Sequence, residues 1–243
     1  MTDAPAPAAA APEVGRGLAI VIGASGGIGS ALQAALAAES RWAAVVGFSR
    51  ATQPAIELTD EASIAAAAAH VAALQIEPRR ILVASGVLQG EGAKAEKSWS
   101  ELNVASLERA FAVNAIGPAL VMKHFLPLLP RRAPSVFAVL SARVGSIGDN
   151  RLGGWYGYRA SKAALNQLVR TASIELRRTR PAAICVALHP GTVRTNLSAA
   201  HRTDHLTVRD PPEAAALLLE VIERLGPQHS GLLLDYRGEP LPW

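Results

Sequence analysis

The chain has 243 residues, half of them hydrophobic and 18% charged, which is enough apolar sequence for the core of one ordinary to large domain and excludes disorder of the whole chain. The net charge of +4 is spread along the sequence without a long Lys/Arg run, so it favours an anionic ligand and does not indicate nucleic-acid binding. The single cysteine, Cys185, excludes a disulfide within the chain, is predicted to be buried, and fits a cytoplasmic location.

The first 16 residues are rich in alanine and proline and are predicted to form a flexible tail. They contain Asp3 and no basic residue before Arg16, which is not typical of a secretory signal peptide. The chain has no stretch of about 18 uninterrupted apolar residues, so we expect neither a transmembrane helix nor a membrane partner. Residues 17–243 are predicted to form the single domain.

From residue 17 onward, short apolar runs alternate with longer helix-like segments. Strands are predicted at 18–23, 42–50, 55–58, 80–86, 135–142, 182–190 and 231–236. Helices are predicted at 28–39, 60–75, 105–128, 156–178 and 211–225. The strands are continuous apolar runs, as a sheet covered on both faces requires. The pattern predicts an α/β fold of the Rossmann type, with a doubly wound parallel sheet of about seven strands.

A glycine-rich turn follows the first predicted strand. Gly23, Gly27 and Gly29 have the spacing G-x-x-x-G-x-G and open the first helix. Such glycines permit a tight turn and a close approach to a pyrophosphate, while the helix N-terminus supplies N–H groups and a favourable dipole. The alternative is a glycine-rich turn that binds nothing. The strand–turn–helix context favours a dinucleotide site.

The second predicted strand ends at Ser49-Arg50, where a carboxylate would bind the ribose 2′-hydroxyl of NAD(H). An arginine there binds a 2′-phosphate through two charge-assisted hydrogen bonds. The sequence therefore favours NADP(H) over NAD(H). The alternative is a solvated surface arginine.

Tyr158 and Lys162 are four residues apart and lie on one face of the predicted helix. A free tyrosine has a pKa of about 10, and a nearby ammonium is expected to lower this pKa so that the phenol exchanges protons near neutrality. The alternative is an ordinary surface pair. Tyr156 has no such partner, because Ala160 stands four residues after it.

Four motifs, in this order, resemble those of the short-chain dehydrogenase/reductase family over nearly all of residues 17–243: "GASGGIG" (23–29), "NAIG" (114–117), "YRASK" (158–162) and "PGTVRT" (190–195). Within the family, the stretches 145–166 and 235–243 are most similar to the C-factor and sniffer-type carbonyl reductases. The resemblance implies an oxidoreductase that transfers hydride between a nicotinamide and a small carbonyl or alcohol substrate. It also implies a homo-oligomer, dimeric or tetrameric.

The resemblance also implies residue roles. Tyr158 would be the acid/base at the carbonyl oxygen, Lys162 would lower its pKa and hold the nicotinamide ribose, and Asn114 would fix a helix bend and a water linking Lys162 to solvent. Val193 and Thr195 would hold the carboxamide. The predicted cofactor-binding residues are Gly23, Ser25, Gly27, Ile28, Gly29, Ser49, Arg50, Leu58, Gly86, Asn114, Tyr158, Lys162, Pro190, Gly191, Val193 and Thr195.

The chain departs from the family pattern at the catalytic serine, whose position is taken by Ala142. Ser141 precedes it and is the candidate catalytic serine, but successive strand residues point to opposite faces of a sheet. Three alternatives are open: Ser141 reaches the carbonyl, Ser146 reaches it, or Tyr158 holds the oxyanion alone. Loss of one such donor typically costs about 10² to 10³ in rate. Two further departures, "VASG" (83–86) and Glu57-Leu58, are expected to be tolerated.

A rival reading is a nucleotide-binding regulatory or signalling protein whose oxidoreductase activity is weak or lost. The C-factor likeness and Ala142 favour it, and the intact Tyr158, Lys162 and Asn114 oppose it. His201 and His205 are four residues apart, but they lack a third ligand and lie in the substrate-lid region of the family. They are expected to be solvated, and no metal site is predicted.

Overall fold

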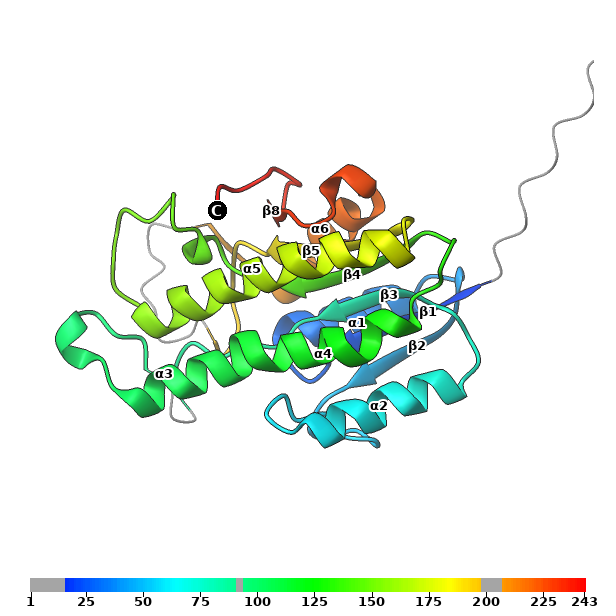
Figure 1. Ribbon diagram of the computed structural model, residues 1–243, viewed down its shortest axis with the longest axis horizontal. Coiled ribbons are helices and arrows are strands. Elements are labelled where there is room, and N and C mark those ends of the chain that lie inside the picture. Colours follow the sequence, from blue (N-terminus) through cyan, green and yellow to red (C-terminus); the bar gives the residue numbers. More distant parts are fainter. Residues whose placement is uncertain (1–15, 91–93, 198–206) are drawn as a thin grey trace, which may run out of the picture.

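A computed structural model describes residues 16–90, 94–197 and 207–243, which form a parallel sheet between two layers of helices (Figure 1). The main sheet has the strand order β2-β1-β3-β4-β5-β8, and every pair in it is parallel. Its strands are β1 (Gly17–Ile22), β2 (Trp42–Phe48), β3 (Pro78–Val83), β4 (Ser135–Leu140), β5 (Ala183–His189) and β8 (Leu233–Asp235). Two short strands, β6 (Thr192–Val193) and β7 (Val208–Arg209), pair separately. The predicted Rossmann-type fold class is confirmed.

Alternation along each strand divides the core between the two faces of the sheet. Leu18, Ile20 and Ile22 of β1 belong to the cluster that α2 (Glu61–Ala73), α4 (Gly117–Phe125) and α5 (Tyr156–Thr179) cover. Ala19 and Val21 belong to the cluster that α1 (Gly27–Ala37) and α6 (Pro211–Glu223) cover. Both faces are therefore apolar, which explains why the strands read as continuous hydrophobic runs.

The strand predicted at 55–58 does not form, so the main sheet has six strands. A parallel neighbour for β2 would need a crossover of about a dozen residues, and only residues 49–54 separate β2 from this segment. The chain instead turns back, and the Ile56 N–H donates to the Ser49 carbonyl at 2.9 Å. The side chains of Ile56 and Leu58 are buried in the same core cluster as α2, which accounts for the apolar character of this segment.

The long helix predicted at 105–128 is a composite of α3 (Val104–Phe111), a π-helical turn (Ala112–Ile116), α4 and a 3₁₀ turn (Leu126–Leu128). By length and composition alone, the run 104–128 is apolar enough to cross a membrane. Val121 and Phe125 are buried in the core, and α4 packs against α2 and α5. Its apolar character is therefore accounted for by its position as a helix covering the sheet.

An ion cluster joins three elements at the amino-terminal end of the sheet. Glu223, the last residue of α6, accepts two hydrogen bonds from Arg41 at 2.7 and 2.9 Å and one from Arg80 of β3 at 2.6 Å. The guanidinium groups of both arginines also lie over the Trp42 ring, 5.0 and 6.0 Å from its centroid. The hydrogen bond from Arg41, followed by the charge of Arg80, lowers the pKa of Glu223 to about 2.

Replacement of Glu223 by glutamine is expected to lower the free energy of unfolding by about 1 kcal/mol at pH 7, since partly exposed ion pairs contribute little more. The folded pKa lies below the ordinary value of 4.5, so the stabilisation is complete above that pH and is lost as the pH falls towards 2. Urea unfolding at pH 7 and pH 3 measures the effect. Glu220→Gln, at an exposed glutamate one turn earlier in α6, is the control. An equal loss of unfolding free energy in Glu223→Gln and Glu220→Gln would show that the ion cluster does not stabilise the fold.

Candidate active site

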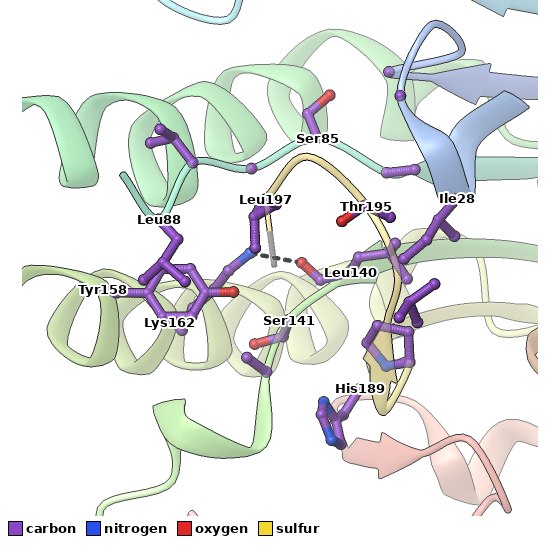
Figure 2. A pocket seen from close by; sticks show the side chains of 18 of the residues that line it. Ile28, Ser85, Leu88, Leu140, Ser141, Tyr158, Lys162, His189, Thr195 and Leu197 are labelled. Carbon is purple, nitrogen blue, oxygen red and sulfur yellow. Dashed lines mark hydrogen bonds between the residues drawn. The ribbon is translucent and has the colours of Figure 1, made fainter. Parts of the chain in front are cut away.

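A cleft of about 1390 Å³ runs across the carboxyl ends of the strands, where doubly wound sheets bind their ligands. All the predicted cofactor-binding residues line it except Gly29 and Asn114. The loops after β1, β2, β3, β4 and β5 all contribute to the lining, together with Tyr236 after β8. Figure 2 shows Tyr158 and Lys162 on the α5 side of this cleft, with Ile28 and Thr195 at its opposite end.

In the glycine turn after β1, three of the glycine positions leave no room for a side chain. Gly23 has φ +91°, and a Cβ there would lie 2.9 Å from the carbonyl carbon of Ala84. A Cβ on Gly29 would overlap the carbonyl oxygen of Gly23, and one on Gly27 would lie 2.8 Å from Cγ2 of Thr195. The glycines therefore bring α1 close to β3 and to the segment after β5.

The N-terminus of α1 opens into the cleft. Its N-cap is Gly26, no side chain of the described residues caps it, and its first turn contains no acidic residue. The first N–H groups of a helix have no partner within the helix, so those of α1 are available to an anion. The residues present therefore fit the pyrophosphate of a dinucleotide.

Ser49 and Arg50 lie at the end of β2 and line the same end of the cleft. The Ser49 hydroxyl oxygen accepts the Ala51 N–H at 3.1 Å, and the Ser49 N–H donates to the Thr52 hydroxyl at 2.9 Å. These bonds shape a tight turn that leaves Arg50 exposed at the cleft. Glu57 is the one acidic residue among the lining residues on this side, and it accepts hydrogen bonds from Thr59.

Tyr158 and Lys162 come from the first two turns of α5 and are 9% and 3% exposed. The Lys162 ammonium donates to the Leu140 carbonyl at 2.8 Å (Figure 2) and lies 5.9 Å from the centroid of the Tyr158 ring. A Cβ on Gly145 would lie 2.8 Å from the Cβ of Lys162. The loop after β4 can therefore pack directly on α5, and it fixes the lysine beneath the phenol.

Burial dominates the proton affinities of the pair. It raises the pKa of Tyr158 to about 12 and lowers the pKa of Lys162 to about 8. The lowering of the tyrosine pKa expected from the sequence does not occur in this structure, because both groups lose solvation and the ammonium bonds a carbonyl rather than the phenol. At pH 7 the phenol therefore keeps its proton, and the amine is mostly charged.

Asn114 occupies the π-helical turn between α3 and α4 and is fully buried. Its side chain accepts the Val87 N–H at 2.8 Å and donates to the Val87 carbonyl at 2.8 Å and to the Ser161 hydroxyl at 3.1 Å. The residue thus ties the loop after β3 to α5 at a helix irregularity. A water between Asn114 and Lys162 stays a prediction.

The position beside the phenol is apolar. Ala142 packs with Tyr158 and Leu88 in one small hydrophobic cluster. The Ser141 hydroxyl donates to Oδ1 of Asn166 at 2.6 Å, although Ser141 also lines the cleft. Ser146 does not line the cleft, and its hydroxyl accepts the Asp149 N–H. Among the described residues, no serine hydroxyl is bonded to Tyr158, and a catalytic role for Ser141 stays a prediction that would require its bond to Asn166 to break.

Further apolar side chains lie against this hydrophobic cluster. Val144, Trp155 and Leu197 pack against the same cluster, and the Trp155 ring meets the Tyr158 ring edge to face with centroids 6.3 Å apart. Trp155 also has a left-handed backbone, with φ 53° and ψ 43°. Such a conformation in a non-glycine residue costs about 1–2 kcal/mol and needs support from its surroundings.

His189, the last residue of β5, lines the cleft (Figure 2) but is not among the site residues predicted from the sequence. Burial lowers its pKa to about 4, so the ring is neutral at pH 7. Its Nδ1 is buried and has no hydrogen-bond partner among the described residues. The position directly before "PG" at a strand end was the available signal.

Two sequence predictions fall partly or wholly outside the described residues. His201 and His205 lie within 198–206, and the predicted tail lies almost entirely within 1–15. In the part of the chain that the structure describes, no group of three or more His, Cys, Asp or Glu side chains is placed to hold a metal. Cys185 is buried, as predicted.

Comparisons with known proteins agree with this geometry. The family model for short chain dehydrogenases matches residues 17–206. The C-signal protein of Myxococcus xanthus is 38% identical over 143 residues, which cover 59% of this chain and 82% of that protein. An NADPH-bound carbonyl reductase from chicken fatty liver is 28% identical with a TM-score of 0.79, over 94% of this chain and 99% of that one. The carbonyl reductase Sniffer of D. melanogaster, 22% identical with a TM-score of 0.80 over 94% and 99% of the two chains, shares the fold. The chain therefore belongs to the short-chain dehydrogenase family of oxidoreductases.

Proposed function

We propose that this protein is an NADP(H)-dependent carbonyl reductase whose reverse reaction oxidises an alcohol. The observation that carries the proposal is the buried Tyr158–Lys162 pair, which shares one cleft with the open N-terminus of α1. A proton donor and a dinucleotide site in one cleft are what hydride transfer to a carbonyl requires. The similarity to an NADPH-bound carbonyl reductase supports the same conclusion.

The cofactor would be held along the cleft by the glycine turn, Arg50 and the segment Pro190–Thr195. When bound, its nicotinamide ring supplies the hydride that reduces the carbonyl carbon. Tyr158 donates its phenolic proton to the carbonyl oxygen, so the substrate gains one hydride and one proton and becomes an alcohol. The Lys162 ammonium, beneath the ring, then stabilises the phenolate until solvent returns the proton.

Tyr158 holds the proton that carbonyl reduction consumes. A phenol with a pKa of about 12 is protonated at pH 7 but is a weak acid, so the phenolate that forms must be stabilised by the nearby Lys162 ammonium. Burial lowers the pKa of Lys162 to about 8, so the lysine can lose its own proton more readily than a solvated lysine. The pair therefore combines a proton donor, Tyr158, with an adjacent ammonium, Lys162, that can lose and regain its own proton.

The apolar side chains around the Tyr158 phenol indicate the substrate class. Leu88, Ala142 and Trp155 pack around Tyr158 and present apolar surface on its side of the cleft. A carbonyl with an alkyl or aromatic substituent would bury that substituent against these side chains. We therefore propose aldehydes, ketones or quinones with an apolar substituent as substrates.

Carbonyl-dependent oxidation of NADPH by the purified protein, over a panel of such aldehydes, ketones and quinones, tests the proposal. Turnover with at least one apolar carbonyl is the expected result. Binding of NADPH without any turnover would favour the rival reading, a nucleotide-binding signalling protein. The similarity to C-signal and the methyl group of Ala142 beside the phenol are the observations that support that rival.

Replacement of Arg50 by alanine is expected to raise KM for NADPH by about 10- to 100-fold and to leave KM for NADH almost unchanged. The reason is that charge-assisted hydrogen bonds to a 2′-phosphate contribute about 1.5–3 kcal/mol, and NADH lacks that phosphate. Steady-state kinetics with both cofactors measures the ratio. Arg151→Ala, at the other end of the cleft lining, is the control. Equal changes for the two cofactors would show that Arg50 does not read the phosphate.

A further inference from the structure

Glu96 is a completely buried carboxylate, with 0% exposure, in the segment between β3 and α3. A carboxylate removed from water is unfavourable unless hydrogen bonds or charges compensate it. Glu96 is not among the residues predicted from the sequence, and the proposed chemistry does not use it. Its contacts show what it does.

The Glu96 side chain joins the starts of two helices. Its Oε2 accepts the N–H of Gly157 in the first turn of α5 at 3.1 Å, and its Oε1 accepts the hydroxyl of Ser106 in α3 at 3.4 Å. Its backbone carbonyl also accepts the Trp155 N–H. Glu96 therefore receives hydrogen bonds from both sides of the residue that begins α5.

Helix α5 has no cap of its own. Its N-cap is Trp155, which makes no side-chain capping bond, and its first turn contains no acidic residue. An N-terminal carboxylate satisfies an N–H group that the helix leaves unpaired and interacts favourably with the helix dipole. Glu96 supplies this carboxylate from 61 residues earlier in the chain.

The fit between Glu96 and α5 is close. A Cβ on Gly157 would lie 3.0 Å from Oε1 of Glu96 and 3.4 Å from side-chain atoms of Leu107 and Ala110. Gly154 also passes near the Glu96 carbonyl, since a Cβ there would lie 3.4 Å from its oxygen. Because Gly154 and Gly157 have no side chain, the start of α5 can lie in contact with Glu96.

We propose that Glu96 is a positioning residue that fixes the first turn of α5 and thereby the Tyr158 phenol. Gly157, which donates to Glu96, directly precedes Tyr158, and the Trp155 ring meets the Tyr158 ring edge to face. The left-handed backbone at Trp155 is held at its N–H by Glu96. The catalytic consequence rests on the proposed reductase function; the placement of the turn does not.

Glu96→Ala tests the proposal, with Glu96→Gln as the conservative variant that keeps an acceptor for the Gly157 N–H. Misplacement of a catalytic group by about 1 Å costs about 100-fold, so Glu96→Ala is expected to lower kcat by about that factor. Its Kd for NADPH should change by less than about threefold, because α1 and Arg50 bind the far end of the cofactor. Glu96→Gln should recover kcat to within about tenfold of the wild type, since the geometry is kept.

The matched control is Glu101→Ala, which removes a carboxylate of the same segment that accepts the Lys97 N–H and, among the described residues, makes no hydrogen bond to α5. It should leave kcat unchanged. Hydrogen exchange of a peptide covering 155–160, measured in the ligand-free protein, should accelerate in Glu96→Ala while the rest of the protein keeps its protection.

Wild-type kcat and unchanged exchange in Glu96→Ala would overturn the proposal. So would a fall in kcat accompanied by lost protection throughout the protein, or a Glu96→Gln variant as impaired as the alanine variant. If the wild type reduces no carbonyl at all, the reductase function fails instead. The exchange measurement then still decides whether Glu96 holds the first turn of α5.

Discussion

Replacement of Tyr158 by phenylalanine is expected to lower kcat for carbonyl reduction by about 10²- to 10⁴-fold, the usual contribution of a positioned acid. Only the hydroxyl is removed, and the ring keeps its packing against Leu88, Ala142 and Trp155. The fold and the Kd for NADPH should therefore be almost unchanged. Stopped-flow oxidation of NADPH under single-turnover conditions measures the chemical step directly.

Tyr156→Phe is the matched control, because it removes a phenolic hydroxyl two residues earlier in the same helix. The residue four positions after Tyr156 is Ala160, so Tyr156 has no lysine partner. It should retain nearly full activity. A Tyr158→Phe enzyme that reduces carbonyls at the wild-type rate would remove Tyr158 from the mechanism. If the wild type binds NADPH but shows no turnover, the result favours a nucleotide-binding regulatory protein. In that case, changes in the glycine turn, and not Tyr158→Phe, should abolish its function.

Most of the fold follows from patterns that are local in sequence. Continuous apolar runs at the positions of β1, β3, β4 and β5, separated by helix-length segments, specify a parallel sheet covered on both faces. The segment 55–58, with the sequence AIEL, is mostly apolar but forms no strand. What decides its conformation is the length of the connection from β2, which is too short for a parallel crossover.

Most of the predicted site residues line one cleft for a similarly simple reason. They follow the carboxyl ends of parallel strands, and those ends meet at one edge of the sheet. The environment of Tyr158 was less accessible from sequence. The spacing to Lys162 predicts an ammonium close to the phenol, but burial of both groups and the bond from Lys162 to Leu140 depend on the packed structure.

Glu96 shows a different limit. The link from Glu96 to Gly157 spans 61 residues and depends on how the segment after β3 crosses the start of α5. The one local signal was an omission: "GGWYGY" begins a helix of 24 residues without a capping side chain. A long helix without a local cap is a reason to search for a partner elsewhere in the chain.

Replacement of Ala142 by serine is expected to raise kcat by about tenfold or more, up to the factor of about 10² that one oxyanion donor commonly contributes. Ala142 packs against Tyr158, whereas the hydroxyl of Ser141 donates to Asn166, eight residues further along α5. A serine at 142 would therefore place a second donor next to the phenol. The gain should occur in kcat, because the donor acts on charge that develops during the reaction.

Ser141→Ala separates the three alternatives for the missing serine. If Tyr158 holds the oxyanion alone, Ser141→Ala should change kcat by no more than about threefold, since only a supporting bond to Asn166 is lost. If Ser141 rotates towards the carbonyl during turnover, this variant should instead lose about 10²-fold, and Ala142→Ser should bring little gain. Ser146→Ala should affect the loop that holds Asp149 rather than the chemistry. The ratio of kcat between Ala142→Ser and Ser141→Ala thus decides whether this active site works with one hydroxyl donor or two.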